Sequence, residues 1–168
     1  MQTFVAKRVL QSYRDLEREI DNQIERVEVI DQRINSVGSP NMSDMPKNPS
    51  PAGDRLALMI AEKLDEEEKL RVMITEAKVR RDLLTEIVSC INGKAGPDKK
   101  YVVLMKYIDC QGWDKITEAL FGAADDFDDR RDAYTRRVFR LHKHALNDID
   151  DIINKRGYKD RLKACGCL

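Results

Sequence analysis

The chain has 168 residues, of which 36% are charged and only 6% are aromatic, with 30 basic and 30 acidic side chains. So little aromatic and apolar material excludes one thick core and predicts apolar stripes along helices. Because the formal net charge is zero, a basic surface that extends over the whole protein is excluded. Any nucleic-acid-binding surface must therefore be local.

Residues 3–37 carry one long helical pattern without proline. Apolar residues recur at alternating spacings of four and three, and a single polar residue, Gln23, interrupts them. The expected seam consists of Val9, Tyr13, Leu16, Ile20, Gln23, Val27, Ile30, Ile34 and Val37. A lone helix of this kind cannot bury its stripe, so the seam predicts a partner helix.

A second long helix is predicted from about residue 53 to residue 91, after a segment (38–53) that holds four of the five prolines. Its expected stripe is Leu56, Ile60, Leu64, Leu70, Ile74, Ala77, Leu84, Ile87, Val88 and Ile91. Two helices of matched length joined by such a bend predict a coiled-coil helical hairpin over residues 1–93. A spacer or oligomerisation rod and an arm that contacts an effector both remain open.

The C-terminal half has the pattern of a helix-turn-helix DNA-binding domain, which we expect over residues 94–157. A helix over 98–109 is followed by a turn at 110–112 and by a second helix that opens at Trp113. An acidic loop (122–132) then leads into a basic helix that is expected to end near Arg156. Residues 158–168 are expected to form a flexible tail. The predicted fold class is thus all-α, a coiled-coil hairpin followed by a helix-turn-helix domain.

The three helices of this domain each carry an apolar face at spacings of three and four. The first helix is expected to turn Tyr101, Leu104, Met105 and Ile108 inward. The core that orients the basic helix is predicted to consist of Trp113, Ile116, Val138 and Leu141.

The opposite face of the basic helix carries the candidate DNA-binding residues. Between residues 130 and 147 there are six arginine and lysine side chains and one acidic one, which gives +5. Arginine can bond guanine bidentately, lysine can meet phosphate, and an aromatic ring can touch a thymine methyl group. The candidates are Thr135, Arg136, Arg137, Phe139, Arg140 and Lys143. The alternative interpretation, a face that is simply solvated, fits less well because acidic residues are nearly missing from it.

Three segments resemble phage late-transcription regulators of the ArpU/RinA type. They are residues 101–109 (Tyr-Val-Val-Leu-Met-Lys-Tyr-Ile-Asp), 112–116 (Gly-Trp-Asp-Lys-Ile) and 137–146 (Arg-Val-Phe-Arg-Leu-His-Lys-His-Ala-Leu). The Ser-Asp-Met-Pro segment at 43–46 also matches the linker of that family. The resemblance implies a helix-turn-helix similar to region four of bacterial sigma factors. It further implies a phage or prophage protein that binds promoter DNA, activates late genes and contacts host RNA polymerase.

One departure from that family lies between the second and third helices. The family usually has a few residues with a glycine there, whereas residues 122–132 supply a longer acidic segment. Aspartates favour a helix N-terminus, so the basic helix is expected to begin near Asp126. Carboxylates at this end would repel phosphate. Two arrangements are open: the loop swings aside, or it pairs with Arg136 and Arg140 and blocks the DNA-binding face.

Other classes of function have little support in the sequence. We expect no enzyme, no cofactor and no metal site, because acid, base and nucleophile do not cluster and no phosphate-binding glycine loop is present. No apolar run is long enough to span a membrane. The four cysteines are scattered, which predicts a reduced, cytoplasmic protein. The resemblance implies that this is the cytoplasm of a bacterial host, where a DNA-binding protein would be associated with the nucleoid.

Two alternatives to a transcription regulator remain. The first is a phage DNA-packaging recognition subunit of the small-terminase type, which would assemble as a ring. The second is a coiled-coil adaptor that binds polymerase without binding DNA. As partners we expect double-stranded DNA and a second copy of the chain, a dimer being favoured because one recognition helix buries little surface.

Overall fold

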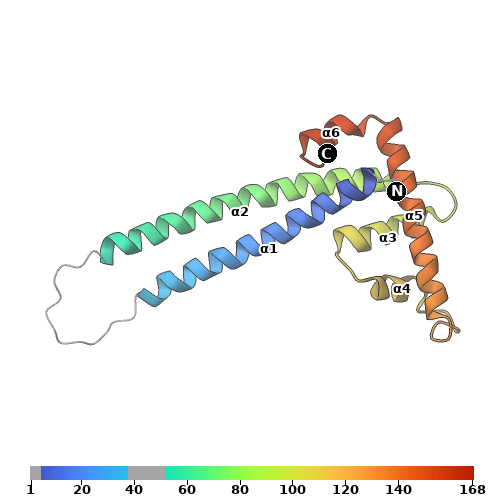
Figure 1. Cartoon of the computed structure of the whole chain (residues 1–168), viewed down its shortest axis with the longest axis horizontal. Helices are drawn as coiled ribbons and strands as arrows, with labels where there is room; N and C mark the ends of the chain where they lie inside the picture. The colour runs from blue at the N-terminus through green and yellow to red at the C-terminus, as the bar shows by residue number, and fades with distance from the viewer. Residues whose placement is uncertain (1–4, 38–51) are drawn as a thin grey trace. The chain divides into compact units, whose positions relative to one another are not determined.

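The computed structural model describes residues 5–37 and 52–168, and every regular element in these two ranges is helical (Figure 1). The elements are α1 (Val5–Val37), α2 (Ala52–Ser89), α3 (Gly96–Val103), the π-helix η1 (Leu104–Ile108), α4 (Trp113–Phe121), α5 (Arg131–Lys155) and α6 (Tyr158–Ala164). The all-α class is confirmed. The expected proline-rich bend lies almost wholly outside the described residues.

The chain divides into two compact units, and the division does not fall at the expected boundary after residue 93. One unit contains Glu17–Thr75, and the other contains Met1–Leu16 together with Glu76–Leu168. The start of α1 and the end of α2 therefore belong with the later helices. Leu10 and Ile87, each only 1% exposed, are part of the core of this larger unit. The helical pattern of the sequence continues without a break through these ends. Periodicity alone therefore cannot show that they belong to a different unit from the rest of the long helices.

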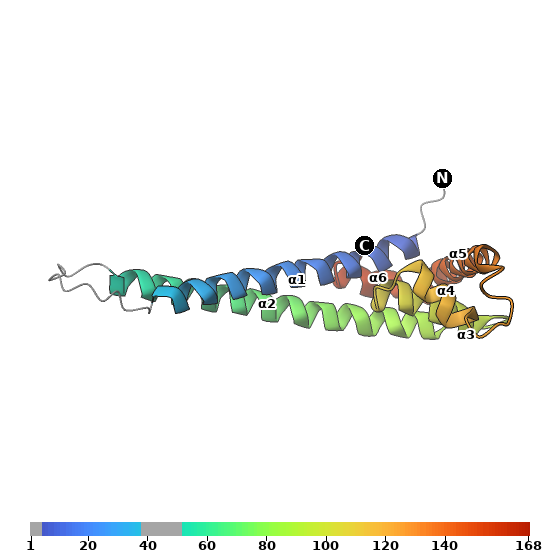
Figure 2. The ribbon, with the colours of Figure 1, turned by 90° about the horizontal axis from the view of Figure 1, so that it is seen from below.

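Within the smaller unit, α1 and α2 lie side by side and antiparallel (Figures 1 and 2). The amide of Gln23 donates to the carboxylate of Glu66 at 2.6 Å and to the Glu66 carbonyl at 3.1 Å. Further along α1, Asp31 pairs with Lys63. The expected α1 seam is confirmed where the structure describes its side chains, since each of its members from Val9 to Ile34 is buried or half-buried.

The predicted stripe of α2 is confirmed in part. Leu56 and Leu70 are half-buried, and the members that belong to the larger unit are buried, namely Ala77, Leu84, Ile87, Val88 and Ile91. Ile60, Leu64 and Ile74, also expected in the stripe, are 43%, 59% and 49% exposed. In the smaller unit, charged Lys63 and Glu66 are shielded as well. They are tolerated because Asp31 pairs with Lys63, while Gln23 and Arg26 contact the Glu66 carboxylate.

In the larger unit, the first predicted helix is confirmed as a helical segment, but it is irregular and begins earlier. The helix was expected to start at residue 98, whereas Gly96 and Pro97 already form the first turn of α3, and the last turn is the π-helix η1. The inward face also differs, because Val102 and Val103 are fully buried whereas Tyr101 is 38% exposed. Residues 101–105 are all apolar, so the sequence allows more than one inward face.

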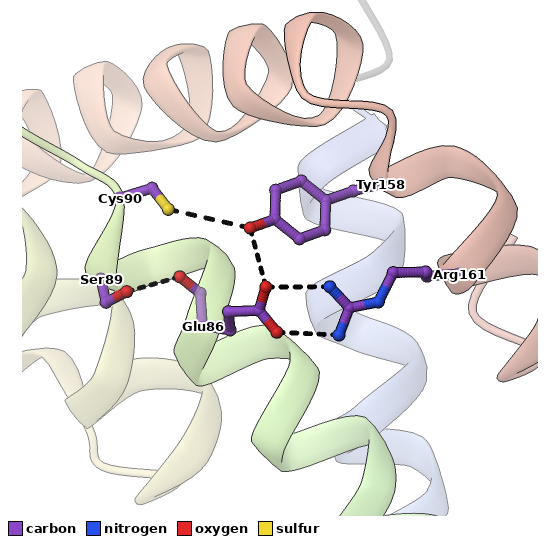
Figure 3. Close-up of polar contacts among 5 residues, drawn as sticks. All are labelled: Glu86, Ser89, Cys90, Tyr158 and Arg161. Carbon is purple, nitrogen blue, oxygen red and sulfur yellow. Dashed lines mark hydrogen bonds and ion pairs between the residues drawn. The ribbon is translucent and has the colours of Figure 1, made fainter.

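The prediction of a flexible tail over residues 158–168 is wrong, because residues 158–164 form the helix α6. The chain turns at Gly157, whose φ of 71° suits glycine, and then buries Leu162 completely and Tyr158 to 7% exposure. The carboxylate of Glu86 on α2 contacts two side chains of α6, Tyr158 and Arg161 (Figure 3). It accepts hydrogen bonds from the Tyr158 hydroxyl at 2.9 Å and from both terminal nitrogens of Arg161 at 2.8 Å. Arg161, with help from Tyr158, lowers the pKa of the Glu86 carboxyl.

Candidate nucleic-acid interface

An apolar cluster fixes α5 against the two helices that precede it. Val102 from α3, Ile116 from α4, and Val138 and Leu141 from α5 form its buried centre. Ala95, Met105, Trp113, Leu120 and Phe121 pack around that centre. The predicted orienting core, Trp113, Ile116, Val138 and Leu141, is therefore confirmed, as is the start of α4 at Trp113. Fixing one face of α5 determines which side chains the other face presents to solvent.

That other face brings most of the predicted DNA-binding residues together. Arg136, Arg140 and Lys143 are exposed, and Phe139 is 44% exposed. Arg136, Phe139 and Arg140 line a shallow groove of about 550 Å³ together with Ala133. The groove therefore combines two arginine side chains with an aromatic ring.

The side chains around the groove are held to different degrees. The Phe139 ring stands edge-on to Trp113, with 5.0 Å between ring centroids and an interplanar angle of 72°. The Nε of Arg136 donates to the Asp132 carbonyl at 3.2 Å. This bond uses one of the five guanidinium N–H groups, so those of the two terminal nitrogens remain available to other acceptors. Arg136 is thus partly preorganised, whereas the structure gives Arg140 and Lys143 no hydrogen bond or ion pair within the described ranges.

Two predicted residues lie outside the groove. The hydroxyl of Thr135 donates to the Arg131 carbonyl at 3.0 Å and is half-buried. The guanidinium of Arg137 lies 4.8 Å from the centroid of the Phe121 ring, a cation–π contact with α4. Their side chains already have partners within the protein, so they are placed at the edge of the candidate surface and not at its centre.

The acidic loop does not pair with the groove arginines. Helix α5 begins at Arg131, five residues after the expected start at Asp126. Asp126 instead accepts a hydrogen bond from the Tyr134 hydroxyl at 2.6 Å and pairs with Arg130 at 2.9 Å. These two donors, Tyr134 first, lower the pKa of the Asp126 carboxyl. Among the residues that the structure describes, no ion pair joins the loop aspartates to Arg136 or Arg140, and Asp125, Asp128 and Asp129 stay exposed.

Lys106 of η1 is a cationic residue near the groove that the sequence analysis missed. Its ammonium group lies 4.6 Å from the centroid of the Trp113 ring, the same ring that Phe139 contacts. Burial lowers its pKa, with a further contribution from Arg14. The available signal was a single lysine inside the apolar segment 101–108, which periodicity had assigned to the core.

His142 packs inside the unit and is not a free side chain on the flank of α5. Its Nε2 lies 3.1 Å from the Tyr107 hydroxyl, and its ring stacks on Tyr107 at 5.7 Å and meets Trp113 edge-on at 5.1 Å. Burial lowers the pKa of His142 from 6.5 to about 4, with nearby Lys7 and Lys106 acting in the same direction. The imidazole is therefore neutral near pH 7.

This shift predicts that the protein loses stability on mild acidification. The folded state resists a proton that the unfolded chain accepts near pH 6.5, so the stabilisation is complete above that pH and is lost between about pH 6.5 and 4. Because the ring is partly exposed, we expect a loss of about 1–2 kcal/mol between about pH 7.5 and pH 5. Urea denaturation at the two pH values measures it. The variant His142→Gln should show a distinctly smaller loss, and an equal loss would contradict the assignment.

Within residues 5–37 and 52–168, no cluster of three or more His, Cys, Asp or Glu side chains is arranged to hold a metal ion. None of the described helices is both long and apolar enough to cross a membrane. Comparison with family models, with curated proteins and with solved structures gives no match. The geometry of α5 and its neighbours is therefore the basis for assigning a function.

Proposed function

We propose that this chain is a DNA-binding transcription regulator whose helix α5 reads the major groove. The observation that carries the proposal is the groove on α5, which Arg136, Phe139 and Arg140 line together on an exposed face that is nearly free of acid. In this proposal α4 and α5 act as the two helices of a helix-turn-helix, with α3 supporting them. The apolar cluster beneath α5 supports it, because base readout requires a rigidly positioned helix.

Each side chain of the groove has a suitable role on duplex DNA. The terminal nitrogens of Arg136 and Arg140 can bond the O6 and N7 atoms of guanine or phosphate oxygens. Phe139, anchored on one edge by Trp113, exposes its other side to a thymine methyl group. Lys143, one turn further on, is suited to phosphate. Thr135 and Arg137 would contact the backbone at the edge of the surface.

The acidic loop can lie beside DNA in this arrangement. Asp126 is partly neutralised by Arg130, and the groove residues begin at Ala133, after the end of the loop. The remaining exposed aspartates would lower the affinity for phosphate without covering the arginines. Such repulsion weakens binding to every DNA sequence alike. Contacts with bases would then contribute a larger share of the binding free energy.

The biological setting follows from the resemblance to phage late-transcription regulators. We propose a phage or prophage protein of the host cytoplasm, bound to promoter DNA beside host RNA polymerase, with α1 and α2 forming a coiled-coil hairpin. The antiparallel contacts between Gln23 and Glu66 and between Asp31 and Lys63 support the hairpin. The hairpin would carry protein contacts, whereas α5 would carry the DNA contacts.

Selection of bound duplexes from a random-sequence pool tests the proposed function. The intact chain is expected to enrich one sequence motif. Phe139→Ala and Arg140→Ala should each relax the preference at particular base pairs, while Lys143→Ala should weaken binding to all sequences alike. The control Lys159→Ala removes an exposed lysine of α6 and should leave the motif and the affinity unchanged. Failure of the intact chain to enrich any sequence would contradict the proposal.

A further inference from the structure

Helix α2 has a second apolar face that α1 does not cover. In the unit formed by residues 17–75, Ile60, Leu64 and Ile74 are between 43% and 59% exposed. They lie on one stripe, because the positions 60, 64, 67, 71 and 74 follow one another at spacings of four and three. Glu67 and Arg71 occupy the middle of this stripe. A helix with apolar residues on more than one side requires more than one partner.

The order of the four stripe residues from Leu64 to Ile74 is the same, with charges reversed, when it is read in the opposite direction about the level of Lys69. Leu64 and Ile74 each lie five residues from Lys69, and Glu67 and Arg71 each lie two residues from it. If two such stripes run antiparallel about a two-fold axis at this level, Leu64 of one copy meets Ile74 of the other. Glu67 then meets Arg71 of the other copy, and each contact occurs twice.

The charges on the stripe are available for such contacts. Glu67 takes part in one ion pair within its own helix, with Lys63 at 3.7 Å, and Arg71 in one with Glu68 at 3.6 Å. Both are neighbouring pairs on a solvent-exposed helix, and exchanging them for pairs between chains costs little. A partner with unrelated sequence would have no reason to match this reversed order, so a second copy of the chain is the occupant that the stripe fits.

We propose that two copies of this chain associate through α2, antiparallel, along the stripe from Leu64 to Ile74. Leu64 and Ile74 form the apolar contacts, and the Glu67–Arg71 pairs set the direction and register. Antiparallel pairing is required, because parallel helices would place Glu67 opposite Glu67 and Arg71 opposite Arg71. This association does not depend on DNA binding, because it is tested by the mass of the protein in solution without DNA.

Sedimentation of the intact chain, whose mass is 19.4 kDa, tests the association. The expected mass is about twice that of one chain, since a two-fold interface of this kind closes after two copies. Leu64→Glu should yield the single-chain mass with unchanged helical circular dichroism. The matched control Val72→Glu changes a residue of α2 that is 50% exposed but lies off the stripe, and it should keep the double mass. A wild-type monomer, or a ring of many copies, would overturn the proposal.

A charge exchange tests the direction of pairing. Glu67→Arg places like charges opposite each other in the antiparallel arrangement, so the dimer should dissociate at least tenfold more readily. Adding Arg71→Glu to the same chain restores opposite charges across the axis and should recover most of the affinity. Dissociation that persists in the doubly substituted chain would overturn the antiparallel register. Unchanged affinity in the single variant would show that the stripe is not the interface.

Discussion

Replacing Ile116 with alanine is expected to lower the free energy of unfolding by about 3–4 kcal/mol. Ile116 is completely buried in the cluster that joins α3, α4 and α5. Truncation removes apolar contacts and leaves a cavity, because three helices hold the surrounding side chains in place. The loss would exceed that of most single substitutions and would fall on the unit that presents the candidate DNA-binding face.

Urea denaturation of the wild type and the variant measures this loss. Val79→Ala is the matched control, because Val79 is an aliphatic residue of the same unit and is 51% exposed. The control should cost about 0.5 kcal/mol or less, as most surface substitutions do. A loss for Ile116→Ala no larger than that of the control would show that this cluster does not hold α5 in place.

The sequence predicted the helices of residues 94–157 well where periodicity was unambiguous. In α4 and α5 the apolar residues are isolated by polar ones, so only one face can turn inward, and Ile116, Val138 and Leu141 are buried as expected. Across the end of α3 and the start of η1, five consecutive apolar residues (101–105) allow more than one inward face, and the π-helical turn then shifts that face. Periodicity determines a face only when polar residues exclude the alternatives.

Contacts between residues distant in the chain explain the other differences. Glu66 is only 4% exposed because Gln23 and Arg26 of α1, together with Lys69 on its own helix, satisfy its carboxylate. No local pattern indicates the two partners from α1. Arg161 is 75 positions from Glu86, yet this pair holds α6 in place. From the sequence alone, Gly157 followed by a charged segment predicts a frayed chain end, because the distant partner Glu86 cannot be recognised.

The loop before α5 shows the same limit in its electrostatics. Its composition predicted repulsion or a block of the arginines, and both interpretations treated the aspartates as one group. In the structure Asp126 has its own partners, Tyr134 and Arg130, while Asp128 and Asp129 remain exposed. The aspartates of this loop thus differ in their hydrogen-bond partners, and the composition of the loop does not reveal that difference.

The substitution with the largest expected effect on binding is Arg136→Ala combined with Arg140→Ala. These two residues supply the guanidinium groups of the α5 groove, and neither belongs to the buried cluster. Each arginine is expected to contribute about 1–3 kcal/mol when it contacts a base or a phosphate. The pair should therefore weaken duplex binding roughly 100-fold and leave the unfolding midpoint nearly unchanged. The double variant Lys155→Ala/Lys159→Ala removes equal charge from exposed positions outside the groove.

Fluorescence anisotropy of a labelled duplex across a salt series tests most directly whether α5 binds DNA. For the wild type, the affinity should fall steeply as the salt concentration rises, because contacts with phosphate release counterions. The Arg136→Ala/Arg140→Ala variant should bind roughly 100-fold more weakly, and the log–log salt slope should become shallower by up to about 2, while the lysine control retains the wild-type affinity. Equal affinity and slope for the arginine variant and the wild type would contradict the assignment of α5 as the DNA-binding helix.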